Sequence, residues 1–320
     1  MKTRTLATDA AGIAEAAVLI ADGQLVAVPT ETVYGLAGDA RDGTAVARIF
    51  EAKGRPSFNP LIVHVPDLET ARRYAVWSDA AETVARAFWP GPLTLVLPLR
   101  AGCGLSPLVT AGQDSVALRV PAHAAAQALL RASGAPLAAP SANPSGRISP
   151  TRPEHVRAGL DGRIAAILDG GACGVGVEST ILGLTDTPIL LRPGGLPAEI
   201  IEEALGAPLP GYQPGSAITA PGQLASHYAP KATMRLGAEA PKPGEVLLGF
   251  GGTPGAALDL SLSGDLLEAA ANLFDHLHRL DTGGATAIAV APVPESGLGR
   301  AINDRLRRAA APRQSVPPKA

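Results

Sequence analysis

Two short loops concentrate the polar chemistry of this chain. They are Lys53–Pro56 (KGRP) and Ser141–Pro144 (SANP), and each carries polar side chains at alternate positions before a closing proline. Arginine presents a planar fork of donors and lysine a compact point charge, while serine and asparagine can each donate to an oxyanion. Together the loops predict an anion site suited to a substrate with several phosphate or carboxylate oxygens.

A third polar segment, residues 29–36 (PTETVYGL), directly follows the strand-like run Leu25–Val28. In open α/β sheets, ligands bind beyond the carboxyl ends of the strands, and this segment offers two threonine hydroxyls and a phenol. A well-capped turn that binds nothing explains the same spacing equally well. The segment is therefore a candidate ligand loop, with the plain turn as an equal alternative.

Two charged or titratable side chains lie inside strand-like runs. His64 belongs to Leu61–Val65, where it shares a face with Ile62. Such a histidine is more often a hydrogen-bonded core residue than part of a ligand site. Alternation puts Arg119 on the same face as Ser115. Because a buried arginine is costly unless it is paired, either an internal carboxylate or a substrate carboxylate should neutralise it.

Composition excludes several classes of protein. Hydrophobic residues make up 46% and charged residues 18% of the 320 residues, as in globular proteins, and the net charge of −2 argues against bulk-charge binding of nucleic acid. The two cysteines, Cys103 and Cys173, form no disulfide framework or zinc pattern. We find no P-loop, no G-x-S-x-G elbow, no metal-ligand motif, no signal peptide and no membrane span. We therefore expect a cytoplasmic protein.

Strands and helices alternate along the chain, which predicts helices covering a mainly parallel or mixed sheet. We expect a first domain over residues 1–205, a Pro/Gly-rich linker or lid over 206–234, a second domain over 235–310 and a disordered tail over 311–320. Helices are expected over 9–21, 44–52, 67–74, 79–88, 122–132, 265–280 and 299–310, and strands over 25–28, 61–65, 93–99, 115–120, 136–139, 164–168, 179–184, 189–191, 245–250 and 286–291.

Taken together, the motifs resemble those of the YrdC/Sua5 family over about residues 10–310. The matching segments of the first domain are TETVYGL (30–36), K-x-R (53–55), FWPGP (88–92), LRVP (118–121), S-x-N (141–143) and EST (178–180). The segments HYAP (227–230), GLG (297–299) and AI-x-DRL (301–306) resemble the long, two-domain Sua5 form. The resemblance implies an open twisted YrdC-like α/β domain, followed by a linker and a small Rossmann-like α/β domain.

The same resemblance implies a nucleotidyltransferase. The expected reaction makes L-threonylcarbamoyladenylate and pyrophosphate from L-threonine, bicarbonate or CO2, and ATP. The product would pass to the tRNA threonylcarbamoyl-transferase machinery for t6A modification at adenosine 37, without tRNA being required for the first step. Mg²⁺ is expected with the ATP phosphates, and no protein-ligated metal is expected.

The resemblance also assigns roles to individual residues. Catalysis is assigned to Lys53, Arg55, Ser141 and Asn143. Threonine is expected near Thr32, His64, Arg119, Ala139 and Ser179, with Arg119 on its carboxylate. ATP is expected near Arg55, Asn59, Ser115, Ser141, Ser149, Arg192 and Tyr228, the last of these acting from a lid. The alternative is a non-catalytic RNA-binding or ribosome-associated module that uses the same cationic cleft.

Overall fold

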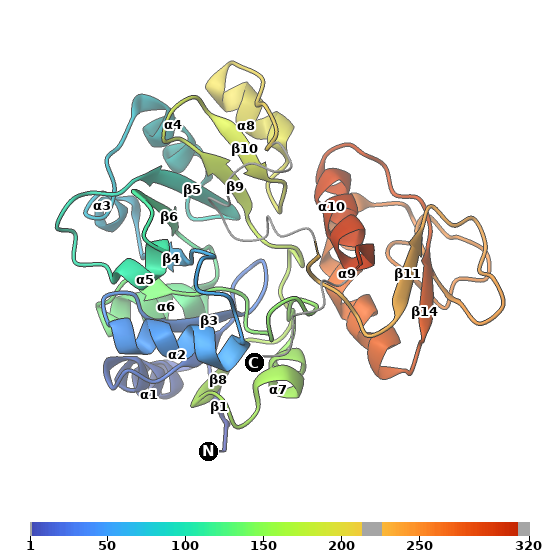
Figure 1. Ribbon diagram of the computed structural model, residues 1–320, viewed down its shortest axis with the longest axis horizontal. Helices are drawn as coiled ribbons and strands as arrows, with labels where there is room; N and C mark the ends of the chain where they lie inside the picture. Colours follow the sequence, from blue (N-terminus) through green and yellow to red (C-terminus); the bar gives the residue numbers. More distant parts are fainter. Residues whose placement is uncertain (1, 213–225, 313–320) are drawn as a thin grey trace, which may run out of the picture.

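The computed structural model describes residues 2–212 and 226–312, which form two bodies, each built on its own sheet (Figure 1). Residues 213–225 of the predicted linker and residues 313–320 of the predicted tail lie outside the described residues. Among the described helices, none has the length and apolar character that crossing a bilayer requires.

The first body contains a ten-stranded mixed sheet with the order β1-β8-β2-β3-β7-β4-β6-β5-β9-β10. The sheet contains both parallel pairs (such as β4 with β6 and β5 with β9) and antiparallel ones (such as β3 with β7 and β5 with β6). The strands are β1 (Arg4–Ala7), β2 (Val26–Val28), β3 (Gly35–Asp39), β4 (Ile62–His64), β5 (Leu93–Pro98), β6 (Ser115–Arg119), β7 (Leu137–Ala138), β8 (Ala166–Asp169), β9 (Thr180–Gly183) and β10 (Ile189–Arg192).

Helices cover one face of this sheet and only part of the other. The helices are α1 (Ala10–Ala21), α2 (Gly43–Lys53), α3 (Leu68–Ala71), α4 (Asp79–Phe88), α5 (Pro107–Thr110), α6 (Ala124–Ser133), α7 (Pro153–Leu160) and α8 (Ala198–Leu205). Helices α2, α4, α5, α7 and α8 contribute to the main core on one face. On the other face, α1 and α6 pack over β1, β8, β2 and β3.

The second face continues beyond α1 and α6 over β4, β6, β5 and β9. The buried residues of its apolar cluster there all come from strands, β10 included: Ile62, Val96, Ala117, Ile181 and Leu191. Alternation places His64 and Arg119 on this face as well, because each lies two residues beyond Ile62 or Ala117 and the two pair directly across the strands. The part of the sheet that no described helix covers therefore carries the predicted polar site.

The second body is a four-stranded parallel sheet with the order β11-β14-β12-β13. Its elements are β11 (Thr233–Leu236), β12 (Val246–Gly249), β13 (Leu258–Asp259), α9 (Leu266–Thr282), β14 (Ala287–Val290) and α10 (Leu298–Ala310). Helices α9 and α10 lie between this sheet and the first body (Figure 1). The core of the second body also includes Val33, Ile148 and Val177 of the first, so apolar packing continues across the junction.

The predicted elements are present with shifted ends, and several elements were not expected. The helix predicted over 67–74 is only the four-residue α3. Strand β3 was missed because its sequence, GLAGD, has two glycines and no β-branched residue. Helix α7 was not expected either, although a proline at its first turn favours a helix start, and β1, α5, α8 and β13 were also not expected. Strand β11 begins at Thr233, inside the range predicted as linker.

Candidate functional site

A polar cleft opens on the part of the first sheet beyond the helices that the structure describes. The empty space in and around it, with open solvent at its mouth included, is about 540 Å³. Its walls come from the loop before β3, from the loop after α2, from β4, β6 and β10, from the loop after β7, and from the segments before β9 and β11. The lining residues are Thr30, Thr32, Val33, Gly35, Arg55, Ile62, His64, Arg119, Ala139, Pro140, Ser141, Glu178, Ser179, Arg192, His227 and Tyr228.

Most of the predicted site residues meet in this cleft. All five residues predicted for threonine line it, together with four of those predicted for ATP: Arg55, Ser141, Arg192 and Tyr228. Five predicted residues do not line it, namely Lys53, Asn59, Ser115, Asn143 and Ser149. Ser115 begins β6, whereas Arg119, which lines the cleft, ends the same strand. Ser115 therefore lies away from the cleft.

Lys53 joins the two polar loops from behind the cleft wall. Its side chain is 3% exposed, and Nζ donates to the backbone carbonyls of Ser141 and Asn143, the latter at 2.6 Å. Burial, with the Arg55 charge beside it, holds the pKa of Lys53 well below its ordinary value. In this arrangement Lys53 fixes the Ser141–Pro144 loop rather than facing the cleft.

Arg55 faces the cleft from a braced position. Its Nε and Nη2 donate to the carbonyls of Asn59 and Pro60 at 3.3 and 3.0 Å. Burial lowers the pKa of Arg55 to about 10, which keeps the guanidinium charged at neutral pH. The Asn59 side chain is buried, and neither its Oδ1 nor its Nδ2 has a hydrogen-bond partner among the described residues.

The Ser141–Pro144 loop is shaped by its own backbone and by β3. Ser141 pairs with Gly35, and a Cβ on Gly35 would lie 3.2 Å from the Ala139 Cβ, so glycine allows this close approach. Asn143 Nδ2 donates to the carbonyls of Pro144 and Arg147, both at 2.9 Å. Asn143 therefore holds the turn, while the neighbouring Ser141 lines the cleft.

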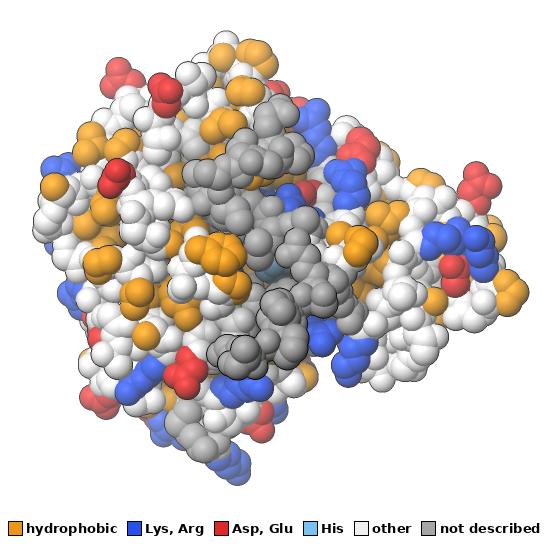
Figure 2. All heavy atoms as spheres, in the orientation of Figure 1, with side chains coloured by type: hydrophobic (Ala, Val, Ile, Leu, Met, Phe, Trp, Pro, Cys, Tyr) orange, Lys and Arg blue, Asp and Glu red, His pale blue; other side chains and the backbone are white. Residues whose placement is uncertain are grey.

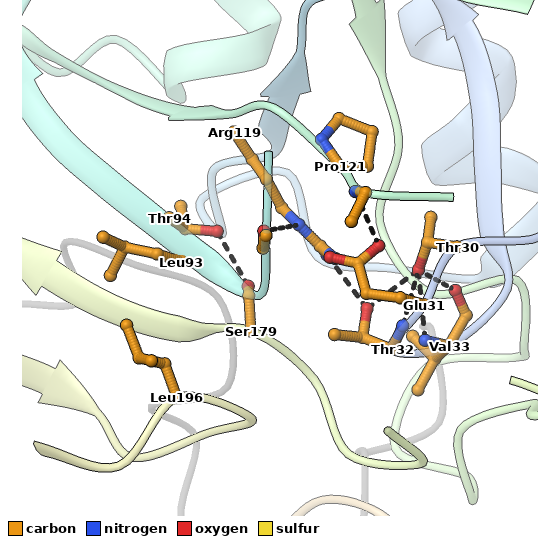
Figure 3. A network of polar contacts seen from close by, with 12 residues as sticks. Thr30, Glu31, Thr32, Val33, Leu93, Thr94, Arg119, Pro121, Ser179 and Leu196 are labelled. Carbon is orange, nitrogen blue, oxygen red and sulfur yellow. Dashed lines mark hydrogen bonds and ion pairs between the residues drawn. The ribbon is translucent and has the colours of Figure 1, made fainter. Parts of the chain in front are cut away.

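Arg119 lies at the centre of a buried polar network (Figure 3). Nη2 pairs with Glu31 Oε1 at 2.6 Å, Nη1 donates to Thr32 Oγ1 at 2.9 Å, and Nε donates to the Gly91 carbonyl at 3.4 Å. An internal carboxylate thus neutralises the arginine, which was one of the two alternatives from the sequence. A guanidinium has five N–H groups, so two remain after these three bonds to described residues.

Ser179 lines the cleft near the Arg119 network, and its side chain and its backbone each have a hydrogen-bond partner. Its Oγ is 2.7 Å from Thr94 Oγ1 (Figure 3), and its carbonyl accepts from Arg192 Nη2 at 2.8 Å. A Cβ on Gly194 would lie 2.3 Å from the Thr180 nitrogen, so only glycine lets the loop after β10 lie this close. This packing brings Arg192 to the cleft.

His64 is a neutral side chain in the cleft wall. It is 5% exposed, and burial, reinforced by the Arg119 charge, lowers its pKa to about 3. Its Nδ1 has no partner among the described residues. A neutral imidazole beside the Arg119 network can accept or donate one hydrogen bond without adding charge, which fits a wall residue rather than a proton-transfer group at neutral pH.

Glu178 is the carboxylate on the cation-rich side of the cleft. Ser149 Oγ donates to its Oε1, and Arg305 Nε donates to its Oε2 at 2.8 Å. Burial alone would raise the pKa of Glu178, but the Arg305 and Arg192 charges outweigh it and the pKa lies below its usual value. Ser149 therefore supports Glu178 in the structure and does not line the cleft.

Tyr228 and His227 close the cleft from the segment before β11. Both are buried, and Tyr228 has a φ of 63°, an uncommon conformation for tyrosine. Parallel pairing of Ala229 with Arg147 holds the segment on the first body. Burial, the largest influence, lowers the pKa of His227 to about 3, so this histidine is neutral too.

Several lining residues were not predicted from the sequence. Glu178 and His227 lie within the EST and HYAP motifs, from which roles are predicted only for their neighbours Ser179 and Tyr228. Glu31, within the TETVYGL motif, also has no predicted role, and it is the partner of Arg119. The apolar lining, such as Val33 and Ile62, has no chemical signal in the sequence. Within the described ranges, no three His, Cys, Asp or Glu side chains gather as a metal site needs.

Comparisons with known proteins match both bodies. The family model for Sua5, YciO and YrdC proteins, described as telomere recombination, matches residues 18–194. The model described as the threonylcarbamoyl-AMP synthase C-terminal domain matches residues 196–311. A threonylcarbamoyl-AMP synthase of Bacillus subtilis is 43% identical and covers 96% of this chain and 95% of its own. One from Pyrococcus abyssi is also 43% identical, over 92% of each chain.

Solved structures agree with the sequence comparisons. The crystal structure of P. abyssi Sua5 complexed with L-threonine aligns with a TM-score of 0.89 at 40% identity, over 97% of this chain and 98% of the other. Escherichia coli YciO, at 24% identity and a TM-score of 0.54, shares the fold over 60% of this chain. This chain therefore belongs to the Sua5/YciO/YrdC family and carries the Sua5 C-terminal domain.

Proposed function

We propose that this protein is a threonylcarbamoyl-AMP synthase, which converts L-threonine, bicarbonate or CO2, and ATP into threonylcarbamoyl-AMP and pyrophosphate. One observation carries the proposal: a single cleft unites a carboxylate-binding arginine, Arg119, with two further arginines, Arg55 and Arg192. Such a cleft suits an amino acid at one end and a polyphosphate at the other. The relatives named threonylcarbamoyl-AMP synthase match almost the entire chain, and the P. abyssi Sua5 structure contains L-threonine.

The amino-acid half of the cleft suits threonine. The two remaining N–H groups of Arg119 can receive the substrate carboxylate while Glu31 and Thr32 keep the guanidinium in place. Ala139 offers a small apolar wall for the substrate methyl group, and the buried hydroxyl of Ser179 offers a polar one. Arginine geometry favours this two-pronged contact with a carboxylate.

The chemistry we propose needs alignment and charge neutralisation. The threonine amine forms a bond to the carbon of CO2 and loses a proton, which gives a carbamate. A carbamate oxygen then bonds to the α-phosphorus of ATP, the bond from that phosphorus to the bridging oxygen of the β-phosphate breaks, and pyrophosphate leaves. Such displacements depend on positioning and electrostatic stabilisation rather than on covalent help from the protein. Because Lys53 is occupied by two carbonyls, we assign it to loop positioning.

The nucleotide half of the cleft suits the phosphates. Arg55 and Arg192 are held rigidly by backbone carbonyls, so their charges are preorganised toward an incoming anion. The Asn59 amide, which has no hydrogen-bond partner among the described residues, is the further polar group that we assign to the nucleotide half. The carboxylate lining the cleft, Glu178, is already bonded to Ser149 and Arg305. Mg²⁺, when bound, would therefore be held by the ATP phosphates and by water molecules, and it would neutralise part of the phosphate charge.

The product is a mixed anhydride, which water destroys, so the reaction benefits from a closed site. Tyr228 and His227 are buried over the cleft and supply such a cover. We further propose that the product serves threonylcarbamoylation of tRNA in the cytoplasm through a separate transferase, and that this chain does not need tRNA for the first step.

The experiment is a pyrophosphate-release assay on the purified protein with each substrate omitted in turn. We expect release only when threonine, bicarbonate and ATP are all present, together with a product that contains both threonine and AMP. Release that is unchanged without threonine would contradict the proposal. Salt-sensitive RNA binding without ATP turnover would instead favour the RNA-binding alternative.

A further inference from the structure

Arg305 is an unusual residue of the second body. It lies in α10, and its side chain is 0% exposed, the largest of the fully buried side chains in the described residues. Arginine is almost never fully buried unless it is paired. Here Nε pairs with Glu178 Oε2 at 2.8 Å and Nη1 with Asp304 Oδ2 at 2.7 Å.

The contacts of Arg305 cross from the second body into the cleft of the first. Glu178 lines the cleft, and Nη1 also donates to the Pro193 carbonyl at 2.8 Å, one residue beyond the cleft arginine Arg192. The guanidinium carbon lies 5.2 Å from the centroid of the Tyr228 ring, which is within the range of a cation–π contact. One side chain of the second body therefore contacts two lining residues, Glu178 and Tyr228, and the residue that follows a third, Arg192.

We propose that Arg305 is a positioning residue for the nucleotide half of the cleft, an inference that rests on the proposed function. Its charge neutralises Glu178, and its plane supports the Tyr228 ring. Without Arg305, the negative charge of Glu178 would be left to Arg192, with which Glu178 already interacts electrostatically. Arg192 would then be less available to phosphate. The second body thus completes the nucleotide site.

A role in holding the two bodies together does not account for these contacts. The ion pair of Arg152 with Asp275 at 2.7 Å also joins the bodies, yet it lies half-exposed and touches no lining residue. Arg305 is buried against the cleft instead, and its Nη2 has no partner among the described residues. This difference supplies a matched control, because both arginines join the same bodies and only one reaches the site.

The test compares Arg305→Gln with Arg152→Gln in the full chain. The readouts are the Kd for ATP by calorimetry, the KM values for ATP and threonine in pyrophosphate release, and thermal unfolding. For Arg305→Gln we expect the Kd and KM for ATP to rise about tenfold, equivalent to about 1.4 kcal/mol, with the threonine KM within about twofold of the wild type. Arg152→Gln should leave all three constants unchanged.

A double variant separates positioning from general stability. If Arg305 acts by neutralising Glu178, then Arg305→Gln/Glu178→Gln should bind ATP more tightly than Arg305→Gln alone, because the uncompensated carboxylate is gone. If Arg305→Gln does not fold, Arg305→Lys keeps the charge without the fork and should show an intermediate rise in the Kd for ATP.

Three results would overturn the inference: a wild-type ATP Kd in Arg305→Gln, equal losses for ATP and threonine, or a double variant weaker than Arg305→Gln. A wild-type protein that binds ATP but releases no pyrophosphate would refute the proposed function instead, and the ATP Kd values would still test Arg305.

Discussion

Arg119 shows how a single buried charge can serve both the fold and the substrate. Glu31 and Thr32 hold two of its nitrogens, so its position does not depend on a ligand. The sequence indicated that this arginine needed a partner, because it lies in the middle of a strand-like run. It could not indicate which partner, since Glu31 is far from Arg119 along the chain and meets it only through the order of the strands.

Removing this side chain should affect the amino-acid half of the cleft alone. We expect Arg119→Ala to weaken threonine binding by roughly 2–5 kcal/mol, because it also leaves Glu31 without its partner. The KM for ATP should stay close to the wild-type value. The measurement is steady-state pyrophosphate release with each substrate varied, and Arg72→Ala, which breaks an exposed pair with Glu82, is the control. A parallel rise in both KM values would contradict this assignment.

Two buried histidines make stability depend on pH. The pKa values of His64 and His227 are lowered to about 3, chiefly by burial. In the unfolded chain the pKa of a histidine is about 6.5, as in model peptides. Between pH values of about 3 and about 6.5, the unfolded state therefore binds more protons than the folded state. Stability is therefore full above the unfolded pKa and falls as the pH drops below it, by up to about 1.4 kcal/mol per pH unit for each histidine.

Urea unfolding between about pH 7 and about pH 5 measures this dependence. His64→Gln should flatten the slope of stability against pH, and His64→Gln/His227→Gln should flatten it further, because glutamine does not titrate. A slope that is the same in the wild type and in the double variant would show that other groups cause the acid sensitivity.

At the scale of elements, the end of α2 sets the position of both cationic residues in the first polar loop. Asp42 caps the start of the helix, and Gly54 ends it in the left-handed conformation with φ 60°. Lys53 then points to the Ser141–Pro144 loop, and Arg55 points to the cleft. The helix was predicted from the sequence over residues 44–52, whereas the missed strand β3 shows that a glycine-rich strand is hard to predict.

We expect Gly54→Ala to reduce the free energy of unfolding by about 1 kcal/mol, because alanine is strained at positive φ. A Cβ there meets nothing within 4 Å, so no clash adds to this cost. Gly134→Ala, at the end of α6 with φ 58° and equally open space, is the matched control. Both variants should lose similar stability in urea unfolding, but only Gly54→Ala should raise the KM for ATP. Equal kinetics in the two variants would argue against this positioning role.

At the scale of the whole molecule, the two bodies are joined by close packing as well as by charge. On the visible face, Lys and Arg side chains are scattered among Asp and Glu rather than forming one continuous patch (Figure 2). The sequence predicted two domains and a lid. It could not show that the core of the second body takes in Val33 and Val177, because contacts between distant segments leave no local pattern.

Gly176 marks a close approach of backbone to backbone between the bodies. A Cβ there would lie 2.3 Å from the Ala270 carbonyl oxygen and 2.4 Å from the Ala271 Cα, both in α9. We expect Gly176→Ala to lower stability by about 1–3 kcal/mol beyond the strain of positive φ, since backbone must move. It should also enlarge the radius of gyration in small-angle scattering and weaken ATP binding.

Gly171→Ala provides the matched control for this variant. Gly171 lies five residues earlier in the same loop, with φ 71° and nothing within 4 Å of its Cβ, against φ 77° for Gly176. It shares the backbone strain without the clash. If the two variants had the same radius of gyration and the same ATP affinity, the approach at Gly176 would not be what holds the bodies together.

The contact between Arg305 and Glu178 has a consequence for biosynthesis. Glu178 leaves the ribosome 127 residues before its partner does. At about 5–20 residues per second, the first body therefore has several seconds in which it can fold before α10 is available. During that interval Glu178 has no arginine from α10 beside it. A nascent chain would thus acquire its amino-acid half first and its finished nucleotide half only near the end of translation.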